Sequence, residues 1–207
     1  MALNVFHFAG VQEMQVTKGL PRLIEIFDAR KSPSTPMMEV YVKSKFNNKD
    51  DVKKIAEKIR EVKLEDVMDE IKINFSDKKI EIEIDKKLLK KNGLTMKKLR
   101  DKLNNRKGVS LKYKGSKLYS DDSSMGYKQL YKLKEKLRDI RVSGVRGVSQ
   151  VLVVKRDREY VIQAAGSNLK GVFKIEGVSK QKTTTNDLHE VAKVLGIEAA
   201  RKAVIDE

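Results

Sequence analysis

The sequence predicts an α+β fold with a substantial core. Some segments place apolar residues every three or four positions, as one face of a helix requires, and others alternate apolar with polar residues, as a half-buried strand does. Residues 52–62 are an example of the first pattern and residues 80–84 of the second. Apolar residues make up 40% of the 207 residues, which is enough for a folded domain of this length.

The first elements are expected to be a helix, a connector and a strand. We expect the helix over about residues 21–30, because a proline such as Pro21 in the first turn loses no useful N–H group. Two further prolines, Pro33 and Pro36, favour an extended connector. Residues 38–42 then alternate as a strand does.

The middle of the chain is expected to mix helices and strands. Residues 48–51 supply a cap and acidic first-turn residues for a helix. The apolar stripe of that helix comprises Val52, Ile55, Ala56, Ile59 and Val62. Two strands follow at residues 71–75 and 80–84, and residues 76–78 have the composition of the turn between them.

Residues 85–105 predict two short helices around a glycine turn. The first contains Leu88 and Leu89 and ends at Asn92-Gly93, and Thr95 can cap the second. This arrangement also fits a small helix-turn-helix, an alternative that the sequence leaves open. A strand at 109–113, a turn at Gly115 and a helix at 126–140 complete this part.

The last part predicts a β-hairpin and two short helices. Residues 151–154 and 160–163 have the pattern of paired strands. Asp187 and Glu190 resemble a capping box at the start of a helix that runs to Leu195. Gly196 interrupts the helix, and a second one is expected over residues 197–204.

Positive charge is concentrated in the middle of the chain. The formal net charge is +16, and residues 86–117 contain 13 basic residues against the single acid Asp101. Such a concentration indicates a surface for a phosphate backbone, whereas the plainer alternative is a solvated, lysine-rich surface. The candidate nucleic-acid-binding residues are Lys86, Lys87, Lys90, Lys91, Lys97, Lys98, Arg100, Lys102, Arg106 and Lys107.

Several kinds of chemistry find no support in the sequence. There is no cysteine, the two histidines lie far apart, and no carboxylate cluster has the spacing of a magnesium loop, so no metal site is predicted. No Walker-type phosphate loop and no Gly-x-Ser-x-Gly elbow occur. No apolar run is long enough to span a membrane, and we expect a cytoplasmic protein that is not a complete enzyme by itself.

Both ends of the chain resemble one known family. LNVFHFAGV at residues 3–11 and GLPRLIEIF at 19–27 are similar to the C-terminal half of the trigger loop of multisubunit RNA polymerases. TNDLHEVAKVLGIEAAR at 185–201 is similar to the end of the same largest polypeptide of those enzymes. The chain thus resembles the archaeal A'' polypeptide, the second piece of a split largest subunit, and is expected to lack the first part of that piece. The resemblance is strong over 1–43 and 142–207 and weak between them.

The resemblance implies roles for three N-terminal residues. His7 matches the histidine that reaches the nucleotide triphosphate and stabilises charge on its leaving group, so it is the candidate catalytic residue. Leu3 matches a residue that stacks under the incoming base, and Asn4 matches one that senses the sugar. Without the resemblance, a lone histidine between two phenylalanines is more often a packed or surface residue.

The resemblance also implies a domain order and partners. Residues 1–43 would carry the trigger helix and connector, 44–141 an inserted basic jaw near downstream duplex DNA, and 142–207 a segment that packs back on the N-terminal part. The expected partners are A'-like, B-like, H and omega-like subunits. No cofactor is expected on this chain, because the catalytic Mg²⁺ would be held by one of those partners. The alternatives are a free-standing basic nucleic-acid-binding protein and an assembly module.

Overall fold

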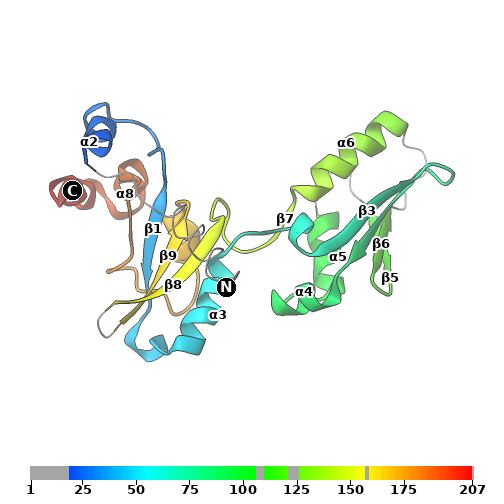
Figure 1. The fold of residues 1–207 in the computed structure, drawn as a ribbon, viewed down its shortest axis with the longest axis horizontal. Coiled ribbons are helices and arrows are strands. Elements are labelled where there is room, and N and C mark those ends of the chain that lie inside the picture. The colour runs from blue at the N-terminus through cyan, green and yellow to red at the C-terminus, as the bar shows by residue number, and fades with distance from the viewer. Residues whose placement is uncertain (1–18, 106–109, 121–125, 157–158, 207) are drawn as a thin grey trace, which may run out of the picture. The chain divides into compact units, whose positions relative to one another are not determined.

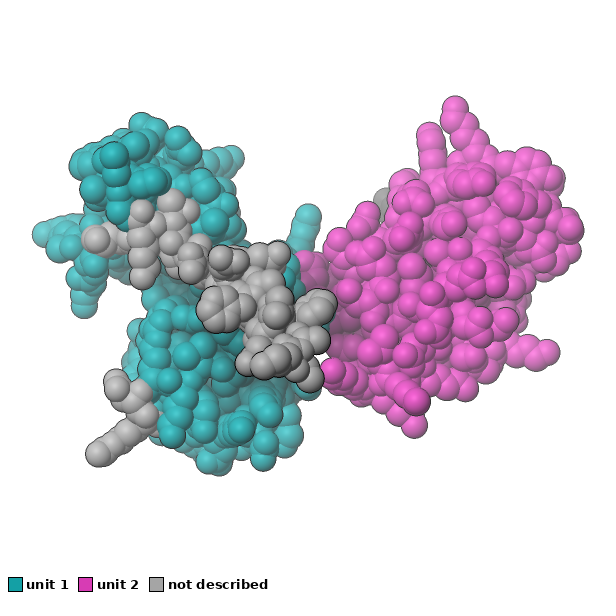
Figure 2. All heavy atoms as spheres, viewed as in Figure 1, with its two compact units in different colours: residues 1–60, 145–207 teal, residues 61–144 magenta. Residues whose placement is uncertain are grey.

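The computed structural model describes residues 19–105, 110–120, 126–156 and 159–206. It contains helices and antiparallel sheets, which confirms the predicted α+β class. The chain divides by packing into two compact units (Figures 1 and 2). Unit 1 comprises residues 1–60 and 145–207, and unit 2 comprises residues 61–144. Unit 1 is therefore assembled from both ends of the chain.

Unit 1 is built on a four-stranded antiparallel sheet. Its strand order is β10-β1-β9-β8, so the long hairpin near the C-terminus pairs with a strand from the N-terminal part. The register places Val40 opposite Ile162, and both side chains are buried. The strands are β1 (Met37–Tyr41), β8 (Gln150–Arg156), β9 (Glu159–Ala165) and β10 (Thr184–Thr185).

Helix α3 (Lys49–Ile59) belongs to unit 1, whereas the sequence-based division placed residues 44–60 in the inserted block. Its buried side packs against β8 and β9, and Val52 and Ile59 are fully inaccessible. These contacts join segments about a hundred residues apart, which explains why composition alone did not reveal them. Val62, which the sequence placed on the same helical stripe, lies beyond the end of the helix in strand β2 (Val62–Lys63) and is buried in the core of unit 2. The other helices of unit 1 are α2 (Leu20–Phe27), α7 (Leu169–Val172), α8 (Leu188–Leu195) and α9 (Ile197–Ile205).

Unit 2 has its own four-stranded antiparallel sheet, in the order β3-β4-β6-β5. Alternation in β4 puts Ile80, Ile82 and Ile84 in the core and leaves Glu81 and Glu83 on the opposite face. The strands are β3 (Met68–Asn74), β4 (Lys79–Ile84), β5 (Leu111–Lys114) and β6 (Lys117–Ser120). A second, two-stranded sheet pairs β2 (Val62–Lys63) with β7 (Arg141–Ser143).

Three helices complete the core of unit 2. They are α4 (Lys86–Lys91), α5 (Met96–Asn104) and α6 (Tyr127–Arg138). Leu99 and Leu103 of α5, with Leu130 and Leu137 of α6, are fully buried beside the isoleucines of β4. This packing fixes which side of α5 faces solvent. None of the helices in the described ranges is both long and apolar enough to cross a membrane.

Candidate nucleic-acid interface

Helices α4 and α5 are joined by a short turn, and a side chain caps the start of each helix. The carboxylate of Asp85 accepts hydrogen bonds from the N–H groups of Lys87 (2.6 Å) and Leu88 (3.3 Å) at the start of α4. Gly93 turns the chain with a φ of 64°, and the hydroxyl of Thr95 accepts from the N–H of Lys98 (3.4 Å) at the start of α5. The predicted helix stop and cap are thus confirmed.

The two helices direct their lysines to solvent. Leucines at four positions anchor the segment in the core: Leu89, Leu94, Leu99 and Leu103. The exposed lysines are Lys86, Lys87, Lys90, Lys91, Lys97 and Lys98. We call these six the lysine face. None of them forms an ion pair with another residue in the described part of the chain. Their charges therefore remain available to an external anion such as a phosphate backbone.

Arg100 is held differently from the lysines. Its Nη2 and Nε donate to Oδ1 of the adjacent Asp101 at 2.6 and 3.0 Å. Its guanidinium carbon also lies 5.4 Å from the centroid of the Tyr113 ring. The hydrogen bond to Asp101 raises the pKa of Arg100, so Arg100 stays charged, and the adjacent carboxylate offsets part of its positive field. Arg100 therefore offers less uncompensated charge to an external anion than the exposed lysines do.

Lys102 and Arg141 converge on one pocket of about 390 Å³ beside α5 and β7. The ammonium group of Lys102 donates to the backbone oxygen of Val142 (2.7 Å), and Arg141 donates to that of Gly144 (3.2 Å). Burial lowers the pKa of Lys102, and repulsion by Arg141 and Lys98 lowers it further. An anion in this pocket would relieve that repulsion.

Arg141 was not among the predicted residues. It is distant from Lys102 in the sequence, and the two meet because β7 pairs with β2 and packs beside α5. No local motif signals this contact. The β5–β6 hairpin adds further charge near its turn, where the register places Lys114 opposite Lys117.

Five predicted site residues lie outside the described residues: Leu3, Asn4, His7, Arg106 and Lys107. The other eight predicted basic residues all lie on α4 or α5. A metal site is not indicated within the described ranges, where no group of three His, Cys, Asp or Glu side chains could hold an ion.

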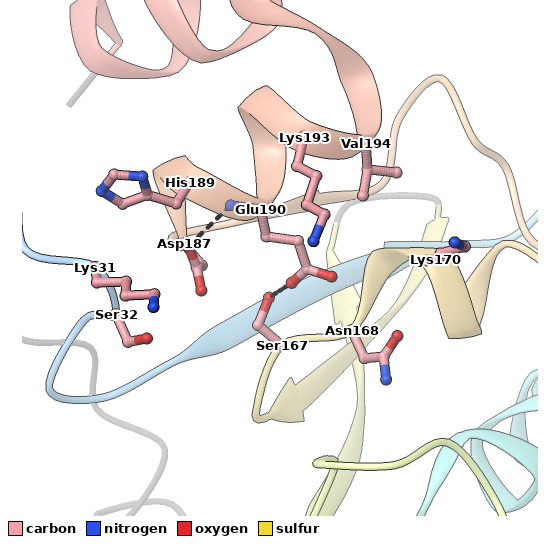
Figure 3. Close-up of a pocket in the computed structure, with 10 residues that line it drawn as sticks. All are labelled: Lys31, Ser32, Ser167, Asn168, Lys170, Asp187, His189, Glu190, Lys193 and Val194. Carbon is pink, nitrogen blue, oxygen red and sulfur yellow. Dashed lines mark hydrogen bonds between the residues drawn. The ribbon is translucent and has the colours of Figure 1, made fainter.

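Unit 1 contains a larger pocket of about 710 Å³ between the connector and α8 (Figure 3). Its two acids have structural roles. Asp187 accepts from the N–H of Glu190 (3.0 Å), as the sequence predicted. Glu190 does not complete a capping box, because its carboxylate accepts instead from the N–H of Leu169 (2.7 Å) and the hydroxyl of Ser167. These bonds tie α8 to the loop after β9.

Comparisons with known proteins place these features in context. The family model RNA polymerase Rpb1, domain 5, matches residues 1–207. The chain is also 40% identical over 206 residues to DNA-directed RNA polymerase subunit Rpo1C of Methanocaldococcus jannaschii. That alignment covers 99% of this chain and 24% of the relative, so the chain spans about a quarter of the relative's length. Both matches confirm the resemblance found at the two ends of the sequence.

Proposed function

The chain belongs to the RNA polymerase Rpb1, domain 5, family, and from this membership we propose that it works as part of the largest subunit of a DNA-directed RNA polymerase. It would act in the cytoplasm, with A'-like, B-like, H and omega-like subunits, one of which holds the catalytic Mg²⁺. Nucleotidyl transfer would need this assembly, and the isolated chain would be inactive.

Within the polymerase, unit 2 would contact downstream duplex DNA. The observation that carries this proposal is the lysine face, whose six lysines point to solvent without an ion pair to any described residue. Lys102 and Arg141 extend it into the pocket beside β7. Lysines spread over two helices suit contacts with phosphates rather than base edges, which is what an enzyme moving along DNA requires.

Residues near the N-terminus would belong to the trigger helix that closes over the incoming nucleotide. His7 would stabilise charge on the leaving pyrophosphate, Leu3 would stack under the base and Asn4 would sense the sugar. Support comes from the family match, which includes these positions in residues 1–207.

The DNA contact can be tested by fluorescence anisotropy of the full chain with a short duplex over a range of salt concentrations. Replacing Lys97 and Lys98 with serine should reduce the slope of log K against log salt by about 2, since each lost phosphate contact removes about 0.9. A matched control replaces Lys128 and Lys132, two exposed lysines of α6, in the same way. Equal slopes for the wild type and the α5 variant would contradict the proposed contact.

A further inference from the structure

The aromatic side chains of unit 2 lie on its surface rather than in its core. Unit 2 has five aromatic residues, whereas the hydrophobic core formed by its described residues is entirely aliphatic. Large rings normally contribute heavily to a core, because each of them buries a large apolar area. Four of the five are 40–53% exposed: Phe75, Tyr113, Tyr127 and Tyr131. These rings therefore need an explanation other than the packing of unit 2.

Three of the exposed rings form one cluster. The centroid of the Phe75 ring lies 5.8 Å from that of Tyr127 and 6.4 Å from that of Tyr131, with interplanar angles of 50° and 45°. The two tyrosines are one turn apart on α6, which packs on β3 and β4 (Figure 1), and Phe75 directly follows β3. Phe75 thus holds both tyrosines in place, while about half of each ring stays accessible.

Two lysines accompany these rings. Nζ of Lys78 lies 5.8 Å from the centroid of the Tyr127 ring. Lys134 follows Tyr131 by three residues, which places it on the same side of α6. Neither lysine forms a salt bridge with another residue in the described ranges. The site therefore combines accessible ring surfaces with positive charge that is open to an external anion.

The backbone at Lys78 is strained. Its φ is 50°, in the left-handed region that residues with a side chain rarely adopt. The turn is fixed by Asn74, whose Oδ1 accepts hydrogen bonds from the N–H groups of Ser76 (3.1 Å) and Asp77 (3.4 Å). Glycine or asparagine would adopt this conformation with less strain, yet the chain has a lysine beside Tyr127. Folding of the turn does not require that ammonium group, which points to a role in binding.

We propose that these residues, Phe75, Lys78, Tyr127 and Tyr131, bind single-stranded nucleic acid by stacking its unpaired bases, and we call them the ring cluster. Bases stack on aromatic rings with little regard to sequence, and nearby cations attract the phosphates between them. Bases in a duplex already stack on each other, so the ring cluster would accept only unpaired ones. A protein partner is disfavoured, because protein interfaces are depleted in lysine. The inference goes beyond the proposed function, in which unit 2 contacts duplex DNA through phosphates.

The test compares two fluorescein-labelled single strands of equal length: an oligothymidylate and its abasic analogue, which has the same phosphates but no bases. In anisotropy titrations, the full chain should bind the oligothymidylate at least about tenfold more tightly. Replacing Tyr127 and Tyr131 with alanine should remove most of this preference and leave the affinity for the abasic strand unchanged. Replacing both with phenylalanine should preserve the preference, because the rings remain. Phe27→Ala is the matched control, because Phe27 is an exposed ring of unit 1, outside the cluster.

A substitution at Lys78 separates binding from folding. Asparagine tolerates a positive φ, so Lys78→Asn should not lower the free energy of unfolding. The same change removes a cation beside the rings. For either strand, the slope of log K against log salt should become shallower by about 0.7, the value for one phosphate contact of a single strand.

Three results would overturn the inference. Equal affinity of the wild type for the two strands would mean that phosphate attraction alone accounts for binding. A preference for the oligothymidylate that survives both alanine substitutions would mean that the bases stack elsewhere. Ring-dependent binding of a labelled peptide of alternating glutamate and leucine, without a preference for the oligothymidylate, would assign the ring cluster to a protein. Duplex binding is measured separately with the Lys97 and Lys98 variant, so failure of the duplex contact would leave this inference standing.

Discussion

Arg100 and Asp101, adjacent on α5, form an ion pair in which Nη2 and Oδ1 lie 2.6 Å apart. Asp101 is the single acid among residues 86–117, and the pair raises the pKa of Arg100. The one acidic residue in the most basic segment thus restrains its neighbouring cation. The lysine face, at residues 86–98, has no comparable restraint from a described residue.

Removing that acid should strengthen DNA binding. Asp101→Asn would keep the shape of the side chain while removing the carboxylate that holds the Arg100 guanidinium, and the slope of log K against log salt should steepen by about 0.9 if Arg100 then binds a phosphate. The control is Glu135→Gln on α6, where Arg138 lies 3.9 Å from the carboxylate. An unchanged affinity for Asp101→Asn would show that Arg100 does not reach the DNA. The measurement is the same anisotropy titration.

The repulsion between Lys102 and Arg141 can be measured directly. Burial is the main cause that lowers the pKa of Lys102, and Arg141 is the next. Arg141→Ala should therefore raise the pKa of Lys102 toward its ordinary value of 10.5, and bound duplex DNA should raise it as well. An NMR titration of the lysine ε carbons would follow both effects. A Lys102 pKa that does not move in either experiment would argue against an anion site in this pocket.

Local signals in the sequence were reliable for this chain. The alternation of Ile80, Ile82 and Ile84 correctly predicted β4, and the turn around Gly93 correctly separated α4 from α5. Such features depend on residues within one or two turns of each other, so the sequence pattern contains them. The exposure of the lysines on α5 was predictable as well, because Leu99 and Leu103 determine which side of that helix is buried.

Features that depend on distant contacts were not predictable. Pairing of β2 with β7 brings Arg141 to Lys102, and nothing near either residue indicates it. The orientation of α2, which buries its two charged residues and exposes most of its apolar ones, was also hidden, since its apolar run resembles that of a helix packed on its own core. Its actual orientation depends on Asn186 and Ser34, neither of which lies in the helix.

The packing of α2 on the rest of unit 1 should weaken in acid. Hydrogen bonds from Ser34, with help from Arg22, lower the pKa of Glu25 below its ordinary value of 4.5. The stabilisation from this carboxylate is therefore fully present above pH 4.5 and is lost as the pH falls through the lower folded-state pKa. Hydrogen exchange of the α2 amides, corrected for the intrinsic pH dependence of exchange, would measure the loss of this stabilisation. Glu25→Gln should increase exchange at neutral pH and remove the acid response, whereas Glu57→Gln on α3 should behave as the wild type.

Gly166 is a position where any side chain should destabilise unit 1. Its φ is +112°, and a Cβ atom there would lie 1.8 Å from the backbone oxygen of Gly147. Gly166→Ala should lower the free energy of unfolding by at least about 2 kcal/mol, through both strain and the displaced backbone. Chemical unfolding followed by circular dichroism provides the measurement. Gly126→Ala is the control, because that glycine has an ordinary φ of −70° and open space around it.

Replacing His7 with alanine in an assembled polymerase should slow nucleotide addition about tenfold or more. A lost transition-state contact of about 1.4 kcal/mol corresponds to that factor. Rapid-quench measurement of single-nucleotide addition at saturating substrate would isolate the closing step from binding. His189→Ala is a suitable control, because this second histidine of the chain bonds to the backbone of Ala29 in unit 1. Equal rates for His7→Ala and the wild type would remove His7 from the catalytic step, while leaving the family membership and the DNA contact of unit 2 untouched.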